Sequence, residues 1–330
     1  MKLTFILISY NEKEYLEHAI NSCLSQELED FEIIIGDDGS SDGSIEVIEA
    51  YAKKYPKNIR YFVSDRTGVT GKTVIASLRV SAVIQRALQM ALGEYCVVLS
   101  GDDYFYKSSF FKNAIKFLDN NPDYVTYVGG YEKVWEDRPS IEYHITYPRK
   151  IYWARKYVHL STFVFRKSVY DQGTFLQRFC DDTGLQYSLA FSGKWKIEPT
   201  VMFAYRQRSG SIMHKIDMLE NHIVEMMIFQ DVLCKGELYR ESLAKFSYSL
   251  KLVFKQRSEL CNEKYRKYLD NCKNYEHNIL QRVAEFDNKS KIEQTKFKLW
   301  MLGARCLWFY YRILGYSYTV IRKSLVLLKR

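Results

Sequence analysis

A chain of 330 residues with 47% hydrophobic residues is long enough to bury a large core, and its 26% of charged residues and five prolines argue against disorder as its main state. The seven cysteines form no C-x-x-C pair and are odd in number, which argues against a disulfide framework or a zinc site. The net charge of +9 is concentrated in the last hundred residues and predicts an anionic partner, which could be nucleic acid, a membrane surface or a phosphate-bearing substrate.

The first hundred residues alternate between short apolar runs and segments of helical periodicity, which is typical of β-α-β units on a mostly parallel sheet. The apolar runs predict strands over residues 3–9, 31–37, 59–63 and 95–100. Asn11 and Glu14 resemble a capping box at the start of the first helix. Residues 64–73, which include Lys72, are expected to form a loop before a helix over about 74–92. The first apolar run is too short for a signal peptide, so we expect a reducing, cytoplasmic location.

The middle of the chain is less regular, yet it predicts helices over residues 110–118 and 185–192 and strands over 124–128, 160–166 and 201–205. From about residue 216 the pattern changes to long helical stretches, such as 218–233 and 238–254. We therefore predict an α/β domain over residues 1–215, with halves at about 1–105 and 106–215, and a helical, basic and aromatic region over 216–330.

The final segment, residues 298–330, combines a basic stripe with aromatic and aliphatic residues. Lys298, Arg305 and Arg312 recur every seven residues and would share one face of a helix. This pattern predicts a helix at a membrane interface, although a helix packed on the α/β domain with arginine side chains extended to water would show the same pattern. The longest uncharged run falls far short of the ~20 residues that a spanning helix needs.

Acidic residues follow two of the predicted strands. Asp102 and Asp103 follow the apolar residues of VVLSGDDYF, and Asp37 and Asp38 follow those of IIIGDDGSSDG. Ligands of open α/β sheets bind beyond the carboxyl ends of the strands, so we expect both turns to face one ligand. Carboxylates there can hold Mg²⁺ or Mn²⁺ together with phosphate oxygens. Alternatively, each acidic pair ends its strand in a turn and has no other role.

A third acidic pair, Asp181 and Asp182, lies in FCDDTGLQYSLAFSG just before a predicted helix. One of these carboxylates could act as a general base if an acceptor hydroxyl came within reach. Capping of the helix amino terminus is the alternative, because that end of a helix stabilises negative charge.

The three acidic pairs and their surroundings resemble the family-2 glycosyltransferases, inverting enzymes of GT-A fold that use nucleotide-diphosphate sugars. The resemblance covers roughly residues 1–212 and rests on ILISYNEKEYLEHAINSCLSQ, FEIIIGDDGSSDGS, ALGEYCVVLSGDDYF, CDDTGLQYSLAFSGK and AYRQRSGSI. It implies an α/β fold with a mostly parallel sheet flanked by helices, in which residues 1–105 bind the donor and 106–215 form the acceptor half.

The resemblance also implies roles for individual residues. The residues that would bind the nucleotide sugar are Ser9, Tyr10, Asn11, Asp38, Lys72, Arg79, Asp102, Arg206 and Arg208. Asp103 and Asp102 would hold Mn²⁺ or Mg²⁺, since they occupy the D-x-D region. Asp182 matches the catalytic carboxylate, and Asp181 stands beside it where Glu is frequent.

Two positions depart from the family pattern. Where many relatives show D-x-D-D, this chain has Ser100 in place of the first acid. Where Y-R-x-H is common, Arg208 replaces the histidine, which removes a possible ligand and adds positive charge.

The resemblance implies transfer of a sugar from a nucleotide-diphosphate donor, with UDP as the expected nucleotide, to a hydroxyl acceptor with inversion. A glycan or lipid-linked glycan at the inner face of the membrane is the expected acceptor, as in bacterial capsule or O-antigen synthesis. Two alternatives are a catalytically silent scaffold that binds nucleotide or membrane and a nucleotidyltransferase. Nucleic acid is not expected as a partner, because no base-reading motif is present.

Overall fold

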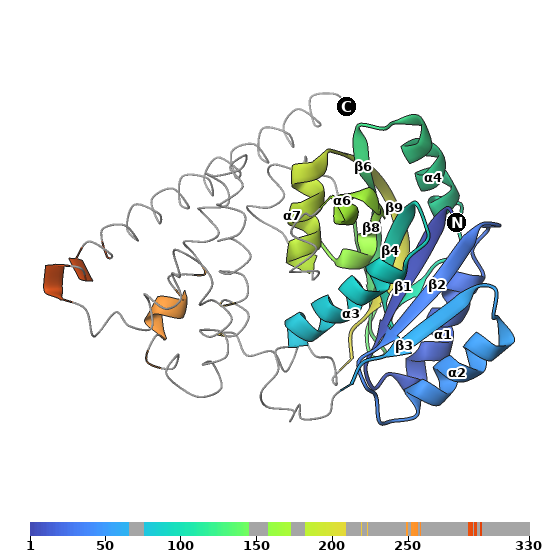
Figure 1. The fold of residues 1–330 in the computed structure, drawn as a ribbon, viewed down its shortest axis with the longest axis horizontal. Coiled ribbons are helices and arrows are strands. Elements are labelled where there is room, and N and C mark those ends of the chain that lie inside the picture. The colour runs from blue at the N-terminus through green and yellow to red at the C-terminus, as the bar shows by residue number, and fades with distance from the viewer. Residues whose placement is uncertain are drawn as a thin grey trace. The chain divides into compact units, whose positions relative to one another are not determined.

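A computed structural model describes residues 1–65, 76–144, 158–172 and 182–208, together with scattered positions between 219 and 298. The chain divides into two compact units, the first formed by Met1–Tyr147 and Val158–His214 and the second by Pro148–Tyr157 and Lys215–Arg330. Nearly all described residues belong to the first unit, in which helices surround a single sheet (Figure 1).

Four parallel strands form the amino-terminal part of the sheet. They lie side by side in the order β3 (Ile59–Val63), β2 (Phe31–Asp37), β1 (Leu3–Ser9) and β4 (Tyr95–Ser100). Strands β1 and β2 are buried along their whole length, which explains why their sequences are continuous apolar runs. The bounds of all four strands are those that the apolar runs predict.

The sheet continues beyond β4 with mostly antiparallel strands. The order after β4 is β8 (Phe163–Arg166), β6 (Tyr124–Val134), β9 (Lys194–Arg206) and β5 (Tyr104–Phe105), while β7 (Ile141–Tyr143) pairs with β6. Strands β6 and β9 are longer than predicted, and only the second half of β9 was predicted because its partly exposed first half carries charged residues and a proline. Residues Leu160–Thr162 form the 3₁₀ helix η1 instead of the start of a strand.

Helices cover both faces of the parallel strands (Figure 1). Helices α1 (Lys13–Leu24), α2 (Ser44–Lys54) and α4 (Phe110–Asn120) pack on one face and share its core. Helix α3 (Ala76–Met90) lies on the other face, where Gly36 leaves room for it. A Cβ built on Gly36 would lie only 2.5 Å from Val83 Cγ1. The short helix α6 (Ser168–Asp171) and helix α7 (Asp182–Ser192) follow β8.

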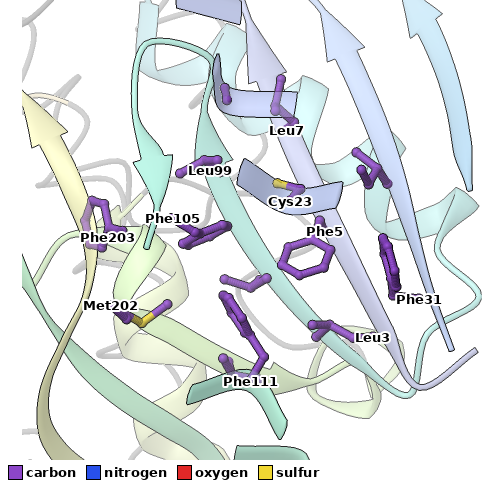
Figure 2. Packing of buried hydrophobic residues seen from close by; sticks show 14 of the residues in the cluster. Leu3, Phe5, Leu7, Cys23, Phe31, Leu99, Phe105, Phe111, Met202 and Phe203 are labelled. Carbon is purple, nitrogen blue, oxygen red and sulfur yellow. The ribbon is translucent and has the colours of Figure 1, made fainter. Parts of the chain in front are cut away.

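An aromatic cluster at the centre of the core holds the turn that follows β4 (Figure 2). The ring of Phe5 on β1 lies 5.1 Å from Phe111 on α4 and 5.8 Å from both Phe31 and Phe105. Phe105 comes two residues after the acidic pair at 102–103, and its backbone amide donates to Ser22 Oγ at 3.1 Å. Packing of Phe105 on β1 therefore fixes the downstream end of the acidic turn.

Among the described residues, no helix combines the length and apolar character that crossing a bilayer requires. The helices predicted over 218–233, 238–254 and 298–330 fall largely outside the described residues. They stay predictions, as does contact of the last one with a membrane.

Replacing Phe105 by alanine should destabilise the first unit and loosen the acidic turn. Removing a buried aromatic side chain typically costs ~3–5 kcal/mol of unfolding free energy. Phe105 is buried, and its ring also lies 4.9 Å from that of Phe111. Denaturant unfolding should show this loss, whereas Tyr61→Ala, at a residue 37% exposed on the edge strand β3, should change the unfolding free energy by only about 0.5 kcal/mol. Equal losses in the two variants would contradict the anchoring role.

Candidate functional site

The order of the strands brings the two acidic turns to one edge of the sheet. Strands β2 and β4 flank β1, with Ser9 opposite Asp37 and Ile8 opposite Ser100. Adjacent strands lie about 4.8 Å apart, so the carboxyl ends of β2 and β4 are separated by roughly 10 Å. The backbone amides of Asp38 and Gly101 donate to carbonyl oxygens of β1 at 2.9 and 2.7 Å, and they hold both turns against the end of that strand.

The two aspartates after β2 have different surroundings. Asp37 is fully buried, and its carboxylate accepts hydrogen bonds from the amide and the hydroxyl of Ser40 at 2.7 and 2.6 Å, which makes it part of the turn. Asp38 accepts from Arg79 Nε on α3 at 2.7 Å and also from its Nη2. This hydrogen bonding raises the pKa of Arg79. The structure thus joins Asp38 and Arg79, two predicted nucleotide contacts, in one ion pair.

Asn11 supports the turn after β2 and does not cap α1. Its backbone has a φ of +54°, and its Oδ1 accepts from the amide of Ser41 at 2.9 Å. The predicted capping box is wrong, since the N-cap is Glu12 and has no side-chain cap. Asp42 takes that role from the neighbouring turn and accepts from the amide of Lys13 at 3.0 Å. A contact across the strand ends has replaced the local one.

Asp102 and Asp103 lie in the turn between β4 and β5, and their side chains have different partners. Asp102 Oδ2 accepts from Arg208 Nε at 2.7 Å. Asp103 is fully buried, and its Oδ1 accepts from the backbone amide of Arg206 at 2.9 Å. Both partners lie at the carboxyl end of β9, more than a hundred residues away along the chain. Burial, followed by the charge of Asp102, raises the pKa of Asp103 well above its usual range.

Glu12 is a third carboxylate of this site that sequence reasoning missed. Its Oε1 accepts from Arg208 Nη2 at 3.0 Å, and its buried Oε2 has no hydrogen-bond partner. A Cβ built on Gly101 would lie 2.4 Å from Oε2, so glycine at 101 admits this carboxylate. Burial and the charge of Asp102 raise the pKa of Glu12. An available signal was its position directly after the predicted nucleotide contacts at 9–11.

Arg206, the last residue of β9, and Arg208, two residues beyond it, also stack on aromatic rings. The guanidinium of Arg206 lies 4.8 Å from the centre of the Tyr104 ring and 5.1 Å from that of Tyr15, and Arg208 lies 5.0 Å from Tyr15. Such cation–π contacts hold the positive charges in place beside the carboxylates. Next to Arg208 is a hollow of about 490 Å³, and its other lining residues are Asn11, Glu12, Lys13, Glu14, Tyr15, Ser41 and Asp42.

His159 lies behind Asp103 and is the second residue that sequence reasoning missed. Its Nδ1 accepts from the amide of Ser161 at 3.2 Å, so Nε2 carries the proton of the neutral ring and faces Asp103 Oδ2 at 3.9 Å. Burial lowers the pKa of His159 to about 3. The rings of Phe203 and Tyr205 pack on the imidazole at 5.0 and 4.5 Å. A short 3₁₀ segment carries no sequence pattern that would have revealed this histidine.

Asp182 is the first residue of α7, and its Oδ1 accepts from the backbone amide of Leu160 at 2.6 Å. Burial raises the pKa values of Tyr131 and Tyr205 to about 12, and the charge of Asp182 contributes to both shifts. The charge of the Asp182 carboxylate therefore reaches the hydroxyl groups of Tyr131 and Tyr205, two of the aromatic residues around His159. Two further predicted site residues, Asp181 and Lys72, fall outside the described residues.

The charges of the site suit a divalent cation held by one or two carboxylates. Glu12, Asp102 and Asp103 bring three buried carboxylates against two arginines, and Asp103 Oδ2 is buried without a hydrogen-bond partner. No three His, Cys, Asp or Glu side chains within the described parts converge on one point. Mg²⁺ and Mn²⁺ often take one or two carboxylates and complete their shell with phosphate and water, so the pair at 102–103 fits.

The sheet order and the acidic strand ends define a GT-A-like α/β fold, as the sequence predicts. The chain belongs to glycosyl transferase family 2, whose model matches residues 4–174. Structural likeness agrees, since Staphylococcus aureus TarS residues 1–349, solved in complex with UDP-GlcNAc, superposes with a TM-score of 0.59 at 16% identity and covers 97% of this chain and 92% of its own.

The curated relatives match only part of this chain and part of their own length. An uncharacterised protein of Mycobacterium tuberculosis is 25% identical over 64% of this chain, and the chain spans about 60% of that relative. Cholesterol galactosyltransferase of Borreliella burgdorferi is 37% identical over 31% of the chain and 25% of its own length. Poly(ribitol-phosphate) beta-glucosyltransferase of Bacillus spizizenii is 31% identical over 32% of the chain and 15% of its own length.

Asp103→Asn should stabilise the protein in the presence of a chelator, and more so at pH 8 than at pH 4. The folded-state pKa of Asp103 is raised, so the folded state binds the proton more tightly than the unfolded state and stability falls as the pH rises above about 4. Asparagine keeps the acceptor for the Arg206 amide and removes the charge. The melting temperature at pH 8 should rise by about 2–4 °C or more, as a gain of ~1 kcal/mol would produce. A pH-independent difference would contradict this account.

Proposed function

We propose that this protein transfers a sugar from a nucleotide-diphosphate donor, with UDP as the nucleotide, to a hydroxyl acceptor with inversion at the anomeric carbon. The observation that carries the proposal is that Asp38, the acidic pair at 102–103 and the two arginines at the end of β9, Arg206 and Arg208, meet at one edge of the sheet. Membership of glycosyl transferase family 2 supports the reaction class, and the complex of TarS with UDP-GlcNAc supports a uridine nucleotide.

Residues at the ends of β1 and β2 form the proposed nucleotide side of the site. Ser9 ends β1 beside Asp38, and Tyr10 follows it; the carboxylate of Asp38 can accept from a uracil imide or from ribose hydroxyls. Arg79 already holds that carboxylate, so a base that reached Asp38 would also meet the guanidinium. Asn11 and Lys72 stay predicted nucleotide contacts, the former acting through the turn that it supports.

Asp102 and Asp103 are the proposed holders of Mn²⁺ or Mg²⁺. A mannosyltransferase of Pyrobaculum calidifontis solved with GDP-Man and Mn²⁺ shares the fold with a TM-score of 0.50 at 12% identity. A divalent cation held there would stabilise the charge that develops on the departing diphosphate. Arg206 and Arg208 add positive charge at the same edge, and their cation–π contacts keep both guanidinium groups at the site before the donor binds.

Asp182 is the proposed general base. Its carboxylate takes the proton of the acceptor hydroxyl, the hydroxyl oxygen bonds to the anomeric carbon, and the bond from that carbon to the diphosphate breaks. The nucleoside diphosphate leaves with the electron pair. The hydrogen bond from the Leu160 amide orients the Asp182 carboxylate for this role. Asp181 is the neighbouring alternative.

A glycan, free or linked to a lipid, is the proposed acceptor, and surface polysaccharide synthesis is the proposed setting. The similarity to a poly(ribitol-phosphate) beta-glucosyltransferase supports a polymer of the cell surface as acceptor. We propose that residues 1–215 form the catalytic domain and that the basic and aromatic helix predicted over 298–330 keeps the protein at the cytoplasmic face of the membrane.

A donor screen tests the reaction class. Purified protein incubated with UDP-, GDP- and dTDP-sugars should release nucleoside diphosphate from UDP-sugars when Mn²⁺ is present, and this release should be lost when a chelator is added. Failure to release nucleoside diphosphate from every donor, with acceptor glycans supplied, would favour a silent nucleotide- or membrane-binding scaffold. Release of pyrophosphate from nucleoside triphosphates would favour a nucleotidyltransferase.

Asp182→Asn should lower kcat by about 10²- to 10⁴-fold, the usual contribution of a general base, and should leave the affinity for UDP nearly unchanged. The reason is that the variant keeps the acceptor for the Leu160 amide and loses only the ability to take a proton. Turnover assays and calorimetric UDP titrations measure the two quantities. Asp171→Asn is the matched control, because Asp171 is 52% exposed and its carboxylate pairs with Lys167 at the protein surface. Retained turnover in Asp182→Asn would move the base to another residue.

A further inference from the structure

Arg208 bridges two carboxylates that come from different strand ends. Its Nε donates to Asp102 Oδ2 at 2.7 Å, and its Nη2 donates to Glu12 Oε1 at 3.0 Å. The side chains are 21%, 12% and 9% exposed for Arg208, Asp102 and Glu12. Because little water screens these contacts, each partner depends strongly on the others.

The bridge places Arg208 in competition with any cation that Asp102 binds. One oxygen of this carboxylate already accepts from the guanidinium, and a divalent ion bound at Asp102 would lie close to that positive charge. Like charges repel strongly in a site that excludes water. A cation bound at Asp102 therefore weakens the contact between Asp102 and Arg208, and the guanidinium weakens cation binding in the same measure.

Glu12 is placed to retain Arg208 once Asp102 is taken. It lies on the segment after β1, opposite Asp102, and is seated against Gly101, where a Cβ would come within 2.4 Å of its Oε2. Its contact with Nη2 does not use the Nε that Asp102 holds. The hollow of about 490 Å³ beside Arg208 gives the guanidinium room to turn while Glu12 and the ring of Tyr15 keep it at the site.

We propose that Arg208 pairs with the Asp102 carboxylate in the free protein and that a divalent cation binding at Asp102 displaces the Arg208 guanidinium. Glu12 then retains the displaced guanidinium where the donor diphosphate binds. Glu12 is thus a positioning residue, and Arg208 couples the two ligands. Cation and nucleoside diphosphate bind cooperatively, because the first frees the side chain that the second uses. This inference rests on the proposed metal and donor site.

The direction in which Mn²⁺ affinity changes when Arg208 loses its charge distinguishes this coupling from a purely structural role of Arg208. Arg208→Gln removes the competing charge, so Mn²⁺ alone should bind on the order of tenfold more tightly, while UDP in the presence of Mn²⁺ should bind more weakly. Glu12→Gln should do the opposite to Mn²⁺ alone, because Arg208 then has only Asp102 to pair with. Loss of structure would weaken both ligands in both variants.

The experiment titrates the full-length protein with Mn²⁺ alone, following the loss of the free-ion signal in electron paramagnetic resonance, and then with UDP by calorimetry with and without Mn²⁺. Arg208→Lys, which keeps the charge, should bind Mn²⁺ about as the unaltered protein does. Arg138→Ala, at an arginine 59% exposed and paired with Asp137, is the control for an unspecific change in charge. Thermal unfolding identifies the folded variants, and Arg208→Ala replaces Arg208→Gln if the latter does not fold.

The outcomes separate the two proposals. If the unaltered protein binds Mn²⁺ and UDP but loss of the Arg208 charge leaves Mn²⁺ affinity equal or weaker, the coupling is overturned and the proposed function stands. If the unaltered protein binds neither Mn²⁺ nor UDP, the proposed metal and donor site fails and the coupling fails with it. Tighter Mn²⁺ binding with weaker UDP binding after loss of that charge supports the coupling.

Discussion

The position of β1 between β2 and β4 is the constraint on which the site depends. Parallel pairing in fixed register brings three strand ends to one edge, and the acidic residues that follow them are forced into one neighbourhood. Close carboxylates repel, and burial makes each charge more costly. The end of β9 supplies the compensation through the backbone amide of Arg206 and the side chain of Arg208. The order of the strands therefore determines both the fold and the position of the charges in the site.

Packing in the core positions the charged residues at the edge of the sheet. The Phe5 cluster fixes β5 and α4 against β1, and β5 pairs with β9 next to the arginines. The acidic turn is thus held from the core side by Phe105 and from the open side by Arg208. A site with charged groups in so little water needs such support, because small displacements change strong interactions.

Local patterns predicted the fold well and the site only in part. Continuous apolar runs identified β1 to β4 because buried parallel strands have this signature, and the acids that end β2 and β4 were found with them. Glu12 and His159 escaped notice because their roles come from partners far along the chain, such as Arg208, which is 196 residues from Glu12. The capping box failed for the same reason, since Asp42 supplies a contact that no local pattern contains. The division at residue 215 and the roles of individual site residues stay predictions.

Gly101 links two positions that are remote in sequence. A methyl group in place of the side-chain hydrogen of Gly101 would overlap the Glu12 carboxylate. The size of the residue at 101 therefore limits the length of the acid at 12. Natural variants of this chain should accordingly change the two positions together: a larger side chain at 101 calls for a shorter or absent acid at 12. Such paired variation would record, across many sequences, how much space the site leaves for its third carboxylate.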